Sequence, residues 1–126
     1  MLSNRGSGTD AQILAGIDWA LTSGCQVISM SLGADVPFGT PFSQVFETVG
    51  QRALARGTLI VAAAGNASQR DQGIVQPVGH PANCPSFLAV AAIDSANGIA
   101  VFSSTSDPRG GAVDIAAPGV ACTRAG

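Results

Sequence analysis

Charged side chains and long apolar runs are both scarce in this sequence. Charged residues make up 11% of the 126 residues and hydrophobic residues 46%, so we expect much of the chain to be buried in a single domain. The net charge is -2 and the few arginines are scattered, which leaves no basic surface for nucleic acid. No apolar run approaches the roughly 18 residues of a membrane span, so we expect no membrane partner.

The amino-terminal residues MLSNRGSG lack the charged and then apolar regions of a signal peptide, so any export signal would have to lie outside this chain. Cysteine is also sparse: Cys25, Cys84 and Cys122 are an odd number without metal-like spacing. A complete disulfide framework is therefore excluded, and at most one disulfide is expected. We expect no catalytic thiol, because a cysteine nucleophile needs a basic partner that the sequence does not supply nearby.

The chain alternates between helical and strand patterns. Thr9 and Gln12 form a capping-box pattern, and apolar residues then recur at helical spacing until Gly24. The run VISMSLG predicts a strand from Val27 to Gly33, residues 42–57 predict a second amphipathic helix, and Thr58 to Ala64 predict the next strand. Further apolar segments, FLAVAAI, IAVFSS and VDIAAPG, follow a loop rich in glycine, glutamine and proline.

This alternation predicts the fold class. Strand, helix and strand within about forty residues form a βαβ unit with parallel strands that are buried on both faces. We therefore expect an α/β fold with a doubly wound, mostly parallel sheet and flanking helices. Ligands bind such sheets beyond the carboxyl ends of the strands, where the sequence places Ser31, Leu32 and Gly33 after one strand and Gly65 and Asn66 after the next.

Asn66 is the polar residue at this edge with the clearest chemistry. It follows the apolar run LIVAAAG, and its side-chain NH2 could donate a hydrogen bond to a ligand oxygen. From spacing alone, the alternative is a loop asparagine that caps a turn. The residues by themselves leave both readings open.

Five segments in collinear order resemble the subtilisin-like serine proteases, the subtilase or S8 peptidase family. They are GSGTDAQILAGIDWAL, QVISMSLG, LIVAAAGNAS, HPANCPSFLAVAAID and FSS followed by VDIAAPGV. The resemblance covers nearly the whole chain and implies a partial subtilisin-like peptidase domain over residues 1–126. It also implies hydrolysis of peptide bonds in the intact enzyme.

The resemblance further implies the roles of individual residues. Asn66 would donate its amide to the oxyanion of the tetrahedral intermediate. An extended peptide substrate would lie in a cleft, held by main-chain hydrogen bonds. The cleft residues would be Ser31, Leu32 and Gly33 on one wall, Gly6, Ser7 and Gly8 as the opposite edge strand, and Ala63, Ala64 and Gly65 around the pocket for a large apolar substrate residue.

The sequence departs from the family pattern in its catalytic triad. The aspartate and histidine motifs of subtilases precede the matched segment and the serine motif follows it, and none of the three is present here. The only histidine, His80, aligns with a substrate-pocket loop rather than with the catalytic histidine. Because the mechanism needs base, orienting group and nucleophile within hydrogen-bond reach, this chain alone is expected to have no proteolytic turnover.

Several expectations about partners follow from the resemblance. We expect no cofactor or metal ligand in this chain, although calcium is compatible with the intact family member. Secretion is favoured. A parallel sheet that lacks its first strands would expose an apolar edge, so we expect the isolated piece to self-associate.

Two other functions compete with the protease reading. Residues 6–11 fit the dinucleotide-binding pattern G-x-G-x-x-A, but that pattern needs a full hydrophobic strand before it, and only MLSNR is present. The stronger alternative is a non-catalytic, subtilase-like peptide-binding module or folded remnant. The sequence on either side of this chain would distinguish it from a protease segment.

Overall fold

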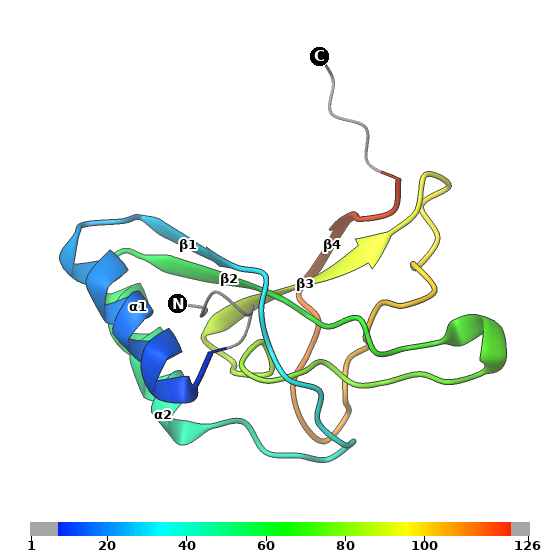
Figure 1. Ribbon diagram of the computed structural model, residues 1–126, viewed down its shortest axis with the longest axis horizontal. Helices are drawn as coiled ribbons and strands as arrows, with labels where there is room; N and C mark the ends of the chain where they lie inside the picture. Colours follow the sequence, from blue (N-terminus) through cyan, green and yellow to red (C-terminus); the bar gives the residue numbers. More distant parts are fainter. Residues whose placement is uncertain (1–7, 122–126) are drawn as a thin grey trace.

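The computed structural model describes residues 8–121, which form a four-stranded parallel sheet and two α-helices (Figure 1). The helices are α1 (Asp10–Thr22) and α2 (Gln44–Ala55). The strands are β1 (Val27–Met30), β2 (Leu59–Ala63), β3 (Phe87–Ile93) and β4 (Ile115–Pro118), in spatial order β1-β2-β3-β4. The predicted α/β class with a parallel sheet and flanking helices is confirmed.

Both helices begin at side-chain caps. Thr9 accepts a hydrogen bond from the backbone N–H of Gln12, and the Gln12 side chain accepts one from the backbone N–H of Thr9, so the predicted capping box is present. The second helix begins two residues later than the predicted start at residue 42. The reason is that Ser43 is the N-cap of α2: its side-chain hydroxyl accepts a hydrogen bond from the backbone N–H of Phe46. Gly57 follows this helix at a φ of 76°, which ends it.

The sheet presents one face to the helices. Side chains alternate along each strand, and Ile28, Met30, Ile60 and Ala62 are buried on the helix side. The helices contribute Ile17 and other apolar residues to the same core. Figure 1 shows α1 and α2 side by side at one end of the molecule, with the loop that carries the short 3-10 helix η1 (Arg70–Gln72) reaching away at the other.

The opposite face of the sheet differs from the expectation of strands buried on both faces. Val27 is 59% exposed and Ile115 is 54% exposed, while Val61 in the central strand is partly buried and Ala63 is exposed. The reason is that no helix within residues 8–121 packs on this side. The apolar run of β2 therefore reflects one fully buried and one partly covered face.

Two further details differ from the sequence patterns. β1 ends at Met30 rather than at Gly33, because the chain leaves the sheet and pairs instead with a distant loop through an isolated bridge between Ala34 and His80. The segment IAVFSS forms no strand; Ile99 makes only an isolated bridge to Ile93.

Within the described part of the chain, neither α-helix is long and apolar enough to cross a membrane.

The described cysteines are free thiols. Cys25 is partly buried and Cys84 is buried, while Cys122 lies outside the described residues. Burial raises the pKa of the Cys84 thiol to about 12, and the neighbouring Glu47 carboxylate adds to this effect. A thiol that stays protonated at neutral pH is a poor nucleophile.

Glu47 ties α2 to the loop before β3. Its buried carboxylate accepts hydrogen bonds from the Ser86 backbone N–H at 3.0 Å and the Ser86 hydroxyl at 2.5 Å. Gln51 donates a third bond at 3.2 Å. This network fixes the start of β3 against the second helix.

We therefore predict that Glu47→Leu lowers the free energy of unfolding by about 1–3 kcal/mol, because the two Ser86 donors lose their acceptor. Urea unfolding followed by circular dichroism measures the change. The matched control is Gln44→Leu, which alters an exposed side chain at the start of the same helix. Equal stabilities of the two variants would contradict this role of Glu47.

Candidate active-site cleft

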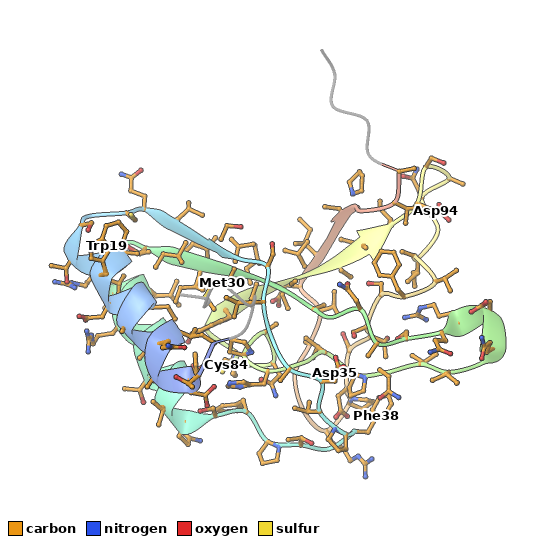
Figure 2. The ribbon with its side chains drawn as sticks, in the orientation of Figure 1. Trp19, Met30, Asp35, Phe38, Cys84 and Asp94 are labelled. Atoms are coloured by element: carbon orange, nitrogen blue, oxygen red, sulfur yellow. The ribbon has the colours of Figure 1, made fainter. Side chains whose placement is uncertain are left out.

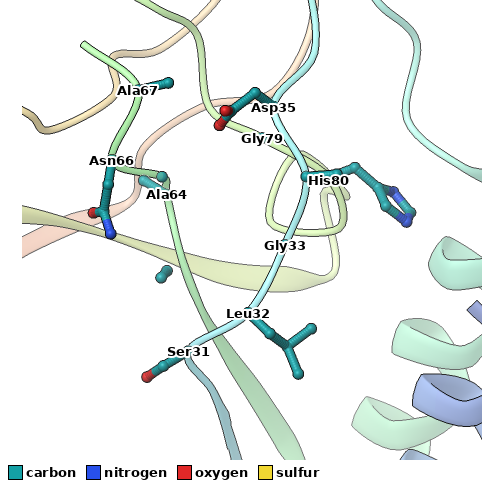
Figure 3. A pocket seen from close by; sticks show the side chains of 12 residues that line it. Ser31, Leu32, Gly33, Asp35, Ala64, Asn66, Ala67, Gly79 and His80 are labelled. Carbon is teal, nitrogen blue, oxygen red and sulfur yellow. The ribbon is translucent and has the colours of Figure 1, made fainter. Parts of the chain in front are cut away.

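A pocket of about 330 Å³ lies at the carboxyl ends of β1 and β2 (Figure 3). One wall is the segment from Ser31 to Asp35, which follows β1, and the other is the segment from Ala63 to Ala67, which ends β2. Because both strands are parallel, their carboxyl ends meet at one edge of the sheet. The pocket therefore lies where the fold class predicts a ligand.

A third segment, Gly79 and His80, joins the two walls. Ala34 and His80 exchange two backbone hydrogen bonds of 2.8 and 2.9 Å, and the Gly79 N–H donates to the Ala64 carbonyl at 2.8 Å. A Cβ atom at Gly33 would lie 2.6 Å from the His80 carbonyl oxygen, and one at Gly79 would lie 2.6 Å from that of Ala34. Glycine at these two positions permits the close approach of the segments.

Asn66 is presented by a turn at the end of β2. Gly65 has a φ of 126°, a conformation that favours glycine, and its carbonyl accepts from the Ser104 N–H at 3.1 Å. Asn66 is exposed, and its side-chain amide has no hydrogen-bond partner among residues 8–121. Figure 3 shows this amide at the edge of the pocket, beside Ala64.

A second hollow of about 410 Å³ lies on the open face of the sheet beside the same strand ends. Ser31, Ala63, Ala64, Gly65 and Asn66 line both hollows. Asn66 is therefore one of the residues at which the two hollows adjoin.

His80 is also a lining residue of the pocket. Figure 3 shows its imidazole pointing away from Asn66 toward the helices. The ring packs edge-on against Phe46 with centroids 4.6 Å apart, and its Nε2 lies 3.7 Å from a carboxylate oxygen of Asp10. The side chain thus belongs to the packing between this loop and the helices.

The structure brings together seven of the ten predicted site residues: Ser31, Leu32, Gly33, Ala63, Ala64, Gly65 and Asn66. Gly6 and Ser7 lie outside the described residues. Gly8 is exposed, belongs to no strand and does not line the pocket. Sequence reasoning missed Ala34, Asp35, Ala67 and Gly79 as lining residues. No His, Cys, Asp or Glu side chains of the described chain form a group of three that could hold a metal ion.

The loop beyond the first wall is fastened by Asp107. This buried carboxylate accepts hydrogen bonds from the backbone N–H groups of Gly39 and Arg109. These two bonds, with a smaller contribution from the Arg109 charge, lower the pKa of Asp107 below its ordinary value. The loop that continues from Asp35 is therefore held against the loop before β4.

Comparison with known proteins identifies the family. Residues 1–125 match the model of the subtilase family. The chain is 41% identical over 120 residues to subtilisin of Bacillus pumilus, covering 95% of this chain and 40% of that protein. It is 40% identical over 120 residues to subtilisin E of Bacillus subtilis strain 168, covering 95% of this chain and 29% of that protein.

Solved structures agree with these sequence matches. Sphericase superposes with a TM-score of 0.71 at 31% identity, covering 94% of this chain and 41% of that one. The subtilisin-like protease Apa1 of Pseudoalteromonas sp. AS-11 gives a TM-score of 0.72 at 30% identity, covering 94% of this chain and 24% of that one. The fold is therefore that of the subtilisin-like proteases. The chain belongs to the subtilase family, and it spans less than half the length of the relatives that it matches.

We predict that Asp107→Asn destabilises the protein at neutral pH, because the amide replaces a charged acceptor of two N–H groups. A carboxyl with a lowered folded-state pKa contributes stability above its ordinary value of 3.8 and loses it as pH falls through the folded-state pKa. The difference in melting temperature between wild type and variant should therefore shrink below about pH 4.

Melting followed by circular dichroism between neutral and acidic pH measures that difference. Asp71→Asn is the matched control, because Asp71 is an exposed carboxylate of η1 without a hydrogen bond in the described structure. A difference between wild type and Asp107→Asn that does not vary with pH would contradict the assigned role.

Proposed function

We propose that this chain forms the peptide-binding cleft of a serine endopeptidase and supplies its oxyanion donor, Asn66. The single observation that carries the proposal is the Asn66 amide, which has no hydrogen-bond partner among residues 8–121 and belongs to a residue that lines both hollows at the strand ends. An exposed amide held by a fixed backbone turn is available to a ligand without first breaking an internal hydrogen bond.

The chemistry explains why such an amide matters. Attack of a serine hydroxyl on a peptide carbonyl places negative charge on the carbonyl oxygen. A donor that is already oriented toward that oxygen stabilises the transition state more than the ground state, so it raises turnover. In this proposal the substrate carbonyl lies above the Asn66 amide, and the serine and its base come from parts of the protein beyond this sequence.

The walls of the pocket support a peptide substrate. Leu32 and Gly33 lie past the end of β1, and their backbone N–H and C=O groups have no partner within residues 8–121. An extended peptide running beside them would gain main-chain hydrogen bonds as an added strand. Ala63 and Ala64 on the other wall are small, which leaves volume for one substrate side chain.

We further propose that this polypeptide hydrolyses no peptide bonds when it is separated from the remainder of a subtilase domain. Its one histidine is committed to packing against Phe46 and points away from Asn66. A nucleophile near Asn66 would therefore lack a base. A protein without the triad would remain a peptide-binding module, the alternative that the same cleft supports.

The main test replaces Asn66 by leucine in the protein as its gene encodes it. We expect turnover of a peptide substrate to fall by about 10²–10³, the loss that follows removal of the oxyanion-donor asparagine from a subtilisin. The melting temperature should change little, because no internal hydrogen bond is lost.

Gln72→Leu is the control, because it removes an exposed side-chain amide on η1 and leaves the pocket intact. Steady-state kinetics and melting curves of both variants measure the effects. If Asn66→Leu and Gln72→Leu retain equal turnover, the oxyanion role is refuted. A wild-type protein that binds peptides without any turnover would favour the binding-module alternative.

We also propose that the protein acts outside the cell. The support is a relative named minor extracellular protease Epr of Bacillus subtilis strain 168, 35% identical over 122 residues, which are 97% of this chain and 17% of that protein. Mass spectrometry of separated culture fluid and cells of the source organism should find its peptides mainly in the fluid. Peptides confined to the cells would contradict this placement.

A further inference from the structure

Asp35 is an acidic residue inside the substrate pocket. It lines the pocket together with Ala64 and Ala67, and it lines the adjoining hollow, again with Ala67. Among the described residues that line the pocket, it is the only carboxylate, and none is lysine or arginine. The only other titratable lining residue, His80, points its ring toward the helices (Figure 3).

The carboxylate reaches across the pocket from one wall toward the other. Its Oδ1 lies 3.9 Å from the point where a Cβ atom of Gly65 would stand, although Asp35 follows β1 and Gly65 follows β2. Figure 3 shows the carboxylate pointing toward the segment that carries Ala67. A substrate side chain that enters between the walls would therefore meet a negative charge.

The fold makes no use of this charge. Asp107, Asp94 and Asp114 each accept backbone hydrogen bonds, and Asp18 pairs with Arg52. Asp35 has neither a hydrogen bond nor an ion pair within residues 8–121, and it is exposed. A solvated surface carboxylate is the ordinary explanation for such a residue. Its position across the pocket, without a competing cation, favours a role in recognition instead.

We propose that Asp35 selects a basic side chain, lysine or arginine, in the peptide that occupies this pocket. The proposal rests on the proposed function of the cleft. The aliphatic part of a lysine would lie along Leu32 and the alanines of the second wall, and its ammonium group would reach the Asp35 carboxylate. The expected large apolar occupant is thus replaced by an apolar stem that carries a charge.

The test measures binding of two fluorescently labelled tetrapeptides that differ only in their carboxyl-terminal residue, lysine or norleucine. Both stems are apolar, so the ratio of the two dissociation constants isolates the charge. Anisotropy titrations use the protein as its gene encodes it, in wild-type form and as Asp35→Asn and Asp71→Asn. Each variant removes one exposed carboxylate, but Asp71 lies on η1 and does not line the pocket.

For the wild type and Asp71→Asn we expect the lysine peptide to bind about fivefold more tightly, the scale of one exposed ion pair. For Asp35→Asn the ratio should fall to about one, with the affinity for the norleucine peptide unchanged. The wild-type preference should also shrink in about 1 M salt, because screening then acts within about 3 Å.

Failure of this inference is distinguishable from failure of the proposed function. If both peptides bind but Asp35→Asn keeps the wild-type ratio, the cleft binds peptides and Asp35 does not select them. If Asp35→Asn weakens both peptides equally, the residue shapes the cleft and the selectivity proposal is overturned. If neither peptide binds the folded wild-type protein, the proposed cleft and the inference fail together.

Discussion

The pocket depends on the backbone hydrogen bonds that Gly79 and His80 make to both of its walls. β1 and β2 are paired only as far as Met30 and Ala62, so the segments beyond them have no ladder to hold them at a fixed separation. The bonds to Ala34 on one side and to Ala64 on the other replace that ladder. Because they are backbone bonds between loops, they fix the width of the pocket without filling it with side chains.

Much of the fold can be predicted from the sequence, because the patterns that mark its helices and strands are local. The capping box at Thr9 and the apolar run of β2 each lie within a few residues, and the structure confirms the elements that they predict. Figure 2 shows how the chain after Met30 departs from the sheet toward Asp35 and Phe38, on the side away from Trp19. That departure is set by a partner some 46 positions later, Ala34 to His80, which no local pattern reveals.

The same distinction explains which site residues sequence reasoning found. Asn66 stands out because a polar amide ends an apolar strand, and the family resemblance supplied the wall residues around it. Asp35 carries no such signal, because a carboxylate in a loop is ordinary until its neighbours in space are known. Its proximity to Gly65 brings together segments that follow two different strands, and it exists only once the parallel register of β1 and β2 is in place.

The acidic residues differ in whether their carboxylates accept hydrogen bonds within the protein. Asp107 and Glu47 are buried, and each is surrounded by N–H or O–H donors, since a buried carboxylate without donors would be costly. Asp35 and Asn66 are exposed polar groups without internal partners, and both stand at the same edge of the sheet. The presence or absence of internal hydrogen bonds thus separates polar groups that stabilise loops from polar groups that remain available to a ligand. In the proposed function, a peptide would replace the water around these two exposed groups with an acceptor for the Asn66 amide and a cation for the Asp35 carboxylate. On the proposals made for Asn66 and Asp35, a peptide with a carbonyl at one point and a basic side chain at the next is a closer chemical match to this cleft than a purely apolar ligand.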